Sequence, residues 1–329
     1  MEPSYRKLLK TGELAKRARE AVARLSRCEL CPRRCRVDRL ADARGFCRVG
    51  RKAQVASSNP HFGEEEVLVG DGGSGTIFFA GCNLGCVFCQ NWDISHVSRP
   101  EWEVGAEGLA AVMLELQAMG TVNINLVTPS HVVPQILEAV VLAVRQGLRL
   151  PLVYNSGGYD APETLELLDG IVDVYMPDVK MADPDAAATY LLARDYPERA
   201  REAVLRMHAQ VGDLVVDRDG LARRGLLVRH LVMPAGLAGT AAWMRFLARE
   251  VSPDTYVNIM DQYRPCGEAE RHPAIARAVT REEYRRAMDF AREAGIRRFD
   301  QRGKAYFLRL LDHLALIDAD AVRKDRGRR

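Results

Sequence analysis

Three cysteines, Cys82, Cys86 and Cys89, have the spacing that points most directly to chemistry in this chain. They follow Thr76–Ala80, an apolar run of β-branched and aromatic residues that predicts a buried strand. Three thiolates so close together can bind one object only if it is larger than a single ion or keeps a coordination position open. A [4Fe–4S] cluster fits, because one of its irons then has no protein ligand. Zinc would normally need a fourth ligand, and His96 is the first His or Cys after the third cysteine.

A second cysteine group lies nearer the N-terminus, in the pattern C-x2-C-x3-C-x11-C: Cys28, Cys31, Cys35 and Cys47. Four thiolates complete the coordination of one centre, and structural zinc and a second, fully ligated iron–sulfur cluster both fit this number. Four arginines among these cysteines would partly offset the thiolate charge: Arg33, Arg34, Arg36 and Arg39. The sequence therefore predicts a second metal centre and leaves open which metal it holds.

The segment GCNLGCVFCQN, residues 81–91, resembles the cluster-binding loop of the radical S-adenosylmethionine (radical SAM) superfamily, in which C-x3-C-x2-C follows the first barrel strand. It is most similar to the loop of the pyruvate formate-lyase-activating enzymes and of their relatives with an N-terminal CxLCPxxC segment. This resemblance implies a [4Fe–4S] cluster on the three cysteines and S-adenosylmethionine as its partner molecule.

The elements that must position these residues alternate between strand and helix from residue 76 onward. Strands are predicted at Thr76–Ala80, Val122–Val127, Leu152–Asn155, Ile171–Met176, Leu226–Val232 and Tyr256–Met260. Helices are predicted at Val104–Met119, Val133–Arg145, Ala161–Leu168, Pro184–Gln210, Ala238–Arg249 and Arg281–Ala294. Six such units predict an α/β fold, a parallel sheet curved into a partial (β/α)6 barrel of the radical SAM type.

The remaining segments predict the domain organisation. Residues 1–60 form a cysteine-rich extension that opens with one amphipathic helix over residues 5–27, and residues 61–75 form a linker with a short strand at Val67–Val69. The barrel spans 76–300 and carries a small hairpin at Gly212–Gly225. Residues 301–329 hold a last helix, at Ala305–Ile317, and a basic tail.

Chemistry in parallel α/β barrels is located where the strands end, so the residues after each strand are candidates for cofactor binding. Ser130 and His131 follow the second strand, where the resembling family often has a Gly-Gly-Glu-like segment that binds the amino group of S-adenosylmethionine; this sequence departs from that pattern. Asn155 ends the third strand, before two glycines that permit close approach of a ligand. His61, in the predicted linker, is a further candidate ligand or substrate group.

The fourth and fifth strands end in charged residues. Asp178 and Lys180 resemble the Asp-x-Lys segment of the activating enzymes, which implies cofactor contact for Asp178 and a place near cofactor or substrate for Lys180. Arg229 lies inside an apolar strand, where an unpaired charge is costly, so we expect it to meet an anion: the cofactor or Asp178. Cys266, after the sixth strand, is either a buried thiol or a hydrogen donor.

Composition sets outer limits on function. The 329 residues are 47% apolar and 28% charged with a net charge of +3, the composition of an ordinary globular protein. No apolar run is long enough to cross a membrane and the N-terminus lacks a signal-peptide core, so we expect a cytoplasmic protein with no membrane partner. In that compartment clustered cysteines indicate metal ligands rather than disulfides. Nucleic-acid binding is not expected from so small a net charge.

These features predict an enzyme that cleaves S-adenosylmethionine reductively to a 5′-deoxyadenosyl radical, which abstracts hydrogen from a substrate such as a protein glycyl residue. An electron donor of the flavodoxin or ferredoxin class and, for the glycyl case, a protein substrate are the partners that this implies. The alternative is a non-enzymatic iron–sulfur electron carrier or scaffold, for which the cysteines alone would suffice. A carrier would not need a barrel with charged residues at its strand ends.

Overall fold

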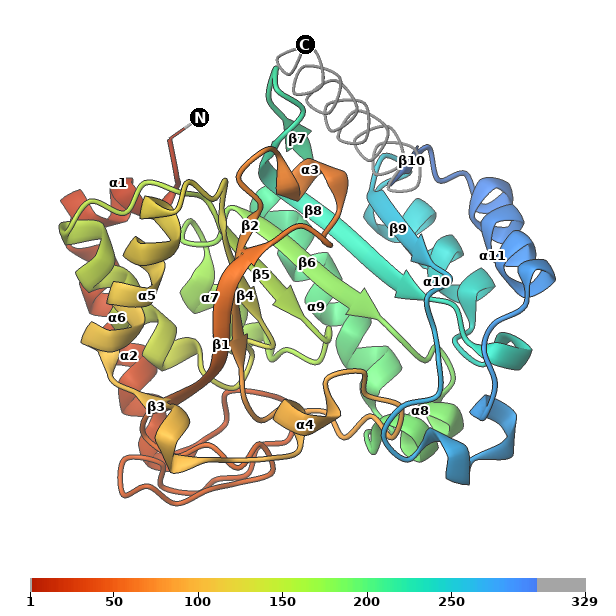
Figure 1. Ribbon diagram of the computed structural model, residues 1–329, viewed down its shortest axis with the longest axis horizontal. Helices are drawn as coiled ribbons and strands as arrows, with labels where there is room; N and C mark the ends of the chain where they lie inside the picture. The colour runs from red at the N-terminus through yellow and green to blue at the C-terminus, as the bar shows by residue number, and fades with distance from the viewer. Residues whose placement is uncertain (1, 301–329) are drawn as a thin grey trace, which may run out of the picture.

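The computed structural model describes residues 2–300, which form an α/β fold around one twisted sheet (Figure 1). Its strands are β1 (Ala53–His61), β2 (Ser74–Phe79), β3 (Glu103–Val104), β4 (Ile124–Val127), β5 (Leu152–Ser156), β6 (Val174–Val179), β7 (Val215–Val216), β8 (Ala222–Leu231), β9 (Tyr256–Met260) and β10 (Arg298–Phe299). The order across the sheet is β10-β9-β8-β6-β5-β4-β2-β1-β3, with β7 paired to β8 as a hairpin. From β2 to β10 along this order the neighbours are parallel, which confirms the predicted partial barrel.

The helices of the described residues are α1 (Tyr5–Lys10), α2 (Glu13–Ala23), α3 (Glu66–Val69), α4 (Trp92–Ser95), α5 (Ala106–Ala118), α6 (Val133–Arg145), α7 (Pro162–Leu168), α8 (Pro184–Leu191), α9 (Tyr196–Val211), α10 (Thr240–Phe246) and α11 (Arg281–Ala294). The helices that follow the parallel strands, together with α1 and α2, cover the outer face of the sheet, whereas α3 lies on the inner face (Figure 1). α6 packs between α2 and α5 and is buried along most of its length, because its apolar residues occupy more than one helical face.

The two faces of the sheet bury different side chains. The outer face carries Ile77, Leu126, Tyr154 and Tyr175, which pack into the main core beneath the helices. The inner face has a smaller apolar cluster near the beginnings of the strands: Leu68 of α3 with Val153, Val174, Met176, Leu214, Ala222 and Leu227. α3 thus closes the inner face at the end opposite the strand C-termini (Figure 1). Polar residues replace apolar ones further along the same strands.

Most predicted elements lie where the sequence places them, and the differences have local causes. β6 begins at Val174 rather than Ile171, because Gly170 adopts a left-handed φ of +68° and the chain turns there. The helix expected at Pro184–Gln210 is two helices, α8 and α9, separated at Leu192, which has a φ of +54°. The hairpin at residues 212–225 is present as the β7–β8 pair.

The N-terminal predictions need larger corrections. The single helix over residues 5–27 is wrong: it divides into α1 and α2 at Gly12, whose φ of +76° ends a right-handed helix. Val67–Val69 is not a strand but part of α3. Residues 53–61, assigned to the extension and linker, form β1, which pairs antiparallel with β2, so the sheet is not wholly parallel. The helix predicted at 305–317 falls outside the described residues.

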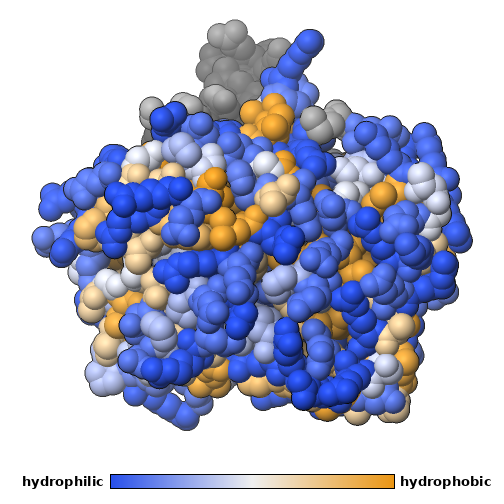
Figure 2. Space-filling view, turned by 180° about the vertical axis from the view of Figure 1, so that it is seen from behind, coloured by the Kyte–Doolittle hydropathy of each residue, from blue (hydrophilic) through white to orange (hydrophobic). Residues whose placement is uncertain are grey.

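The surface behind the sheet is mostly hydrophilic, with apolar residues only in small patches (Figure 2). Within residues 2–300 no helix combines the length and the apolar character that crossing a membrane requires. Both observations agree with a chain whose apolar residues are used mainly to build the core between sheet and helices.

Candidate cluster and cofactor site

The loop of Cys82, Cys86 and Cys89 leaves the end of β2 and is fixed by backbone hydrogen bonds to distant segments. The N–H groups of Gly85 and Val87 donate to the carbonyls at the end of α8, at 3.1 and 3.0 Å. The Val87 carbonyl accepts from the backbone N–H of Glu268, at 2.7 Å, in the segment that follows β9. The fourth and sixth predicted βα units therefore hold the cysteine loop from two sides.

The environment of these three thiols suits an iron–sulfur cluster. Leu84, Val87 and Phe88 are buried around them and supply the apolar shell that such a cluster needs. Burial raises the pKa of Cys86 to about 12, while Lys180 acts in the opposite direction. Bound iron would overcome this burial and keep the thiolate form.

Hydrogen bonds already point at two of the sulfurs. The backbone N–H of Leu84 donates to Cys82 Sγ at 3.3 Å, and the Ser95 hydroxyl lies 3.2 Å from Cys89 Sγ. Donors of this kind stabilise thiolates and tune the reduction potential of a cluster. The residues present therefore fit the cluster predicted from the motif.

Polar side chains of five strands lie on the inner face of the sheet and are called the polar row here. Asp178, Arg229 and Asn258 lie toward the strand C-termini, whereas Asn125 lies level with Val153, nearer the strand beginnings. Strand register places Asp178 beside Arg229 and Arg229 beside Asn258, on β6, β8 and β9. On the neighbouring strands Asn125 of β4 and Asn155 of β5 face the same side, because alternate residues of a strand share a face. The sheet thus brings five polar residues, from five strands, to one surface of the barrel interior.

The charged members of this row form a connected network. Asp178 accepts hydrogen bonds from Lys180 Nζ at 2.8 Å and from Arg229 Nε at 2.7 Å. Arg229 Nη1 lies 3.3 Å from a Glu64 carboxylate oxygen. Burial alone would raise the pKa of Asp178, but the two cations outweigh it and hold that pKa well below its usual range. Lys180 also interacts electrostatically with Cys86, so the network reaches the cysteine loop.

The segment between β1 and α3 adds two carboxylates that sequence reasoning missed. Glu65 is 1% exposed and accepts a hydrogen bond from Asn258 Nδ2 at 2.7 Å, while its second oxygen has no partner among the described residues. Burial raises the pKa of Glu65, and Arg229 opposes that effect. Both amide atoms of Asn125 are likewise buried without a described partner. Such polar atoms are expected to meet a ligand, because burying them unpaired is costly.

The remaining candidates lie at different distances from this row. Asn155 is on it, whereas Ser130 is buried in the loop after β4, beside the Asp160 carboxyl. His61 contacts Glu64 at 3.1 Å, next to the charged network. Cys266 is half-buried in the segment after β9, two residues before the backbone contact with Val87.

The N-terminal cysteines surround a single small cavity. Its wall includes Cys28, Cys31, Cys35 and Cys47 together with Arg39, Asn83 and His131. Asn83 belongs to the loop of the other three cysteines, and a Cβ at Gly81 would collide with the Cys47 carbonyl. The two cysteine groups, 35 residues apart between Cys47 and Cys82, are therefore neighbours in space.

Comparison with known proteins agrees with this geometry. Residues 76–218 match the pattern of the Radical SAM superfamily. An uncharacterized protein of Methanocaldococcus jannaschii, MJ0674, is 33% identical over 271 residues, which are 80% of this chain and 74% of that protein. The chain belongs to the radical SAM superfamily. A [4Fe–4S] cluster and S-adenosylmethionine are the cofactors that this membership implies.

Solved structures similar to this radical SAM protein include a radical SAM methyltransferase from Sphaerobacter thermophilus, with a TM-score of 0.47 and 18% identity over 69% of this chain and 66% of that one. The structure of TYW1 with a lysine–pyruvate adduct bound has a TM-score of 0.42 and 11% sequence identity, over 66% of this chain and 73% of TYW1. HydG, a maturase of the [FeFe]-hydrogenase, has a TM-score of 0.43 and 13% sequence identity, over 65% of this chain and 48% of HydG. The finer resemblance to the pyruvate formate-lyase-activating enzymes stays a prediction.

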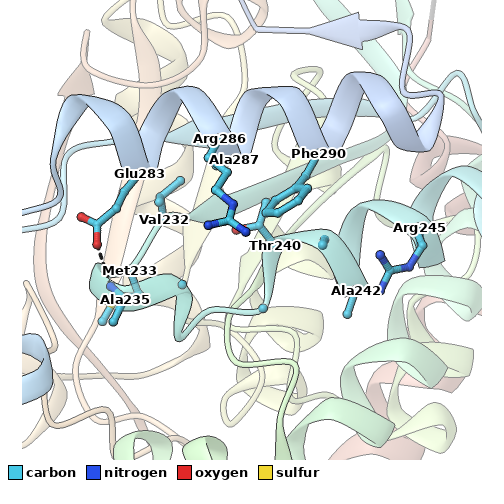
Figure 3. A pocket seen from close by; sticks show the side chains of 13 residues that line it. Val232, Met233, Ala235, Thr240, Ala242, Arg245, Glu283, Arg286, Ala287 and Phe290 are labelled. Carbon is cyan, nitrogen blue, oxygen red and sulfur yellow. Dashed lines mark hydrogen bonds between the residues drawn. The ribbon is translucent and has the colours of Figure 1, made fainter.

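A further cavity of this radical SAM protein opens on the outside of the barrel, between α10 and α11 (Figure 3). Arg245 and Arg286 point along it, and both are exposed. Glu283 at one end accepts from the Ala235 backbone N–H at 2.7 Å and caps α11, so its carboxylate has a structural role. None of the cysteines and none of the polar row lines this cavity, which separates it from the radical chemistry.

Proposed function

We propose that this radical SAM enzyme cleaves S-adenosylmethionine reductively at a cluster held by Cys82, Cys86 and Cys89, and that the resulting 5′-deoxyadenosyl radical abstracts hydrogen from a substrate. The single observation that carries this proposal is the charged network at the strand C-termini, which extends from Glu64 through Arg229 and Asp178 to Lys180, whose charge interacts with Cys86. An electron carrier would gain nothing from such a network inside a barrel.

The network matches the charges of S-adenosylmethionine. That molecule carries a carboxylate, an ammonium and a sulfonium, together with ribose hydroxyls. Arg229 and Lys180 would bind the carboxylate, and Asp178 would hold both cations in position, because it already accepts from each of them. The unpartnered Asn125 amide and Asn155 would complete the binding of polar groups on the same face, and the buried Ser130 hydroxyl in the loop after β4 is a further candidate.

As the substrate class we propose a protein glycyl residue. Support comes from the segment Pro177–Lys180, which resembles the corresponding segment of the activating enzymes and supplies two members of the charged network. An external one-electron donor of the flavodoxin or ferredoxin class would deliver the electron that cleavage consumes.

The first experiment tests cleavage. Anaerobically reconstituted protein, reduced with dithionite in the presence of S-adenosylmethionine, should form 5′-deoxyadenosine. Replacing Cys82, Cys86 and Cys89 with alanine should abolish the product and lower the iron content by about four atoms per chain. Product formation by the triple variant would refute the proposal.

The second experiment tests the substrate class. Protein extract labelled with deuterated glycine is added to the reduced enzyme, and deuterium in 5′-deoxyadenosine is measured by mass spectrometry. Transfer of deuterium is the expected result. Unlabelled 5′-deoxyadenosine formed in quantity would overturn the glycyl proposal and leave the cleavage proposal standing.

A further inference from the structure

The N-terminal cysteine loop encloses a small cavity whose wall carries four thiols, an arrangement that suits a bound metal centre. Cys28, Cys31 and Cys47 are at most 8% exposed, and with Cys35 they line one cavity. The loop is held by short-range hydrogen bonds: the Cys28 N–H donates to the Val37 carbonyl at 3.0 Å, and the Arg36 N–H donates to the Cys28 carbonyl at 2.9 Å. It contains four non-glycine residues with φ between 41° and 64°: Arg34, Arg36, Asp42 and Arg48. Left-handed backbone is strained at non-glycine residues, so a bound group that ties the loop together would offset this strain.

Arg39 indicates the charge of that occupant. The side chain is 1% exposed and lines the cavity, with Nη1 donating to the His131 carbonyl at 2.7 Å and lying 3.8 Å from Cys28 Sγ. Its Nη2 has no hydrogen-bond partner, and no carboxylate pairs with Arg39, within residues 2–300. A buried guanidinium without an anion is strongly unfavourable. Thiolates bound to a metal centre would supply that negative charge.

The arrangement of the thiols bears on which of the two metal centres that the sequence left open is present. One tetrahedral zinc would hold all four sulfurs at about 2.3 Å. Among the described residues no three Cys, His, Asp or Glu side chains are placed to hold a single ion. The same is true of Cys82, Cys86 and Cys89, which the superfamily uses for a cluster. Neither group of thiols is therefore arranged as a single-ion site, which is what a zinc centre requires.

We infer that Cys28, Cys31, Cys35 and Cys47 hold a second [4Fe–4S] cluster, and that Arg39 Nη2 donates a hydrogen bond to one of its sulfurs. The wall of this centre is shared with the other cysteine loop. Arg33 Nε donates to the Asn83 carbonyl at 2.8 Å, and Gly81 packs on the Cys47 carbonyl. A side chain at position 81 would separate the two loops, so glycine is required there.

Metal analysis tests this inference without any measurement of activity. The wild-type chain, reconstituted anaerobically, should contain about eight iron and eight sulfide, and the Cys82, Cys86, Cys89 triple alanine variant about four of each. Alanine at Cys28, Cys31, Cys35 and Cys47 should remove about four from the wild-type number. One zinc per chain, or only about four iron in the wild-type chain, would overturn the inference. The wild-type count decides even where a variant fails to fold.

Arg39 has a separate test with a matched control. In the triple alanine variant the remaining cluster is titrated with dithionite and followed by electron paramagnetic resonance. Arg39→Met should move its midpoint potential to more negative values, because a cation beside the cluster favours the reduced state. Arg36→Met is the control, since Arg36 is exposed and pairs with Glu29 at 2.8 Å. Equal potentials for both variants would contradict the role of Arg39. The S-adenosylmethionine assay is not used, so failure of the proposed function would be seen separately.

Discussion

Arg229 on β8 stands directly beside Asp178 on β6, and its Nε donates a hydrogen bond to Asp178 Oδ1 at 2.7 Å. This pair connects the carboxylates of the β1–α3 segment with Lys180 and the cysteine loop. It answers one question that the sequence left open, because Asp178 is a protein partner for Arg229. A bound cofactor would then add to this pair rather than replace it.

Replacing Arg229 with alanine should therefore reduce both stability and cofactor binding. Loss of a largely buried charge-assisted hydrogen bond is expected to cost about 1.5–3 kcal/mol of unfolding free energy, and affinity for S-adenosylmethionine should fall about tenfold or more. In the double variant with Asp178→Ala, part of the stability should return, since the buried Asp178 carboxylate that lost its guanidinium partner is then absent. Melting curves and binding titrations of both single variants and the double would show this. A variant with unchanged melting and binding would contradict both roles.

Asn125 should behave as a ligand-binding residue and not as a structural one. Its amide is buried without a described partner, so Asn125→Leu should leave the melting temperature unchanged or raise it. The affinity for S-adenosylmethionine, measured by binding titration, should nevertheless fall. Asn123→Leu is the matched control two residues earlier: Asn123 accepts from Ser74 Oγ at 2.7 Å and donates to the Leu68 carbonyl at 2.8 Å. That variant should lose stability, and the opposite pattern in the two variants would refute the assignment.

Ser95 should tune the cluster held by Cys82, Cys86 and Cys89. Its hydroxyl lies 3.2 Å from Cys89 Sγ and 2.8 Å from His96 Nδ1, so it can donate to the sulfur while accepting from the imidazole. Ser95→Ala removes a hydrogen bond that favours the more negative, reduced cluster, and the midpoint potential should become more negative. Ser98→Ala is the control, because the Ser98 hydroxyl accepts a hydrogen bond from Gln54 Nε2 at 2.9 Å. Spectroscopic redox titration would measure both, and a shift of equal size in the control would exclude a specific effect.

His230 should make stability depend on pH. It is fully buried with a pKa lowered to about 4 by burial, its Nδ1–H donating to the Val179 carbonyl and its Nε2 accepting from Thr240. The unfolded chain takes up this proton near pH 6.5, so the stability of the neutral, buried form is present above about pH 6.5 and is lost as the pH falls toward 4.

The expected loss from this group is about 1.4 kcal/mol per pH unit. Denaturant unfolding at several pH values should show that the difference in unfolding free energy between wild type and His230→Asn decreases by about 1.4 kcal/mol for each pH unit between about pH 6 and 4.5. A constant difference between the two proteins would show that His230 does not remain neutral in the folded state.

The sequence by itself determined the features that depend on neighbouring residues. The spacing of Cys82, Cys86 and Cys89 is local, so it identified the cluster loop without knowledge of the fold. Hydrophobic periodicity is also local, and it placed α6, α11 and β9 at the bounds that the structure has. Because parallel strands end at one edge of a sheet, the order of these elements also made Asp178 one of the two partners expected for Arg229, the other being the cofactor.

Only the tertiary structure decided what meets across long sequence separations. Glu65 reaches Asn258 across 193 residues, and Glu64 reaches Arg229 across 165, because the β1–α3 segment folds back over the inner face of the sheet. No periodic pattern marks such carboxylates, since their partners lie on other strands. The contact between Gly81 and Cys47 likewise depends on how the N-terminal loop packs against the end of β2. Local residue preferences specify elements, whereas burial of whole surfaces decides which elements touch.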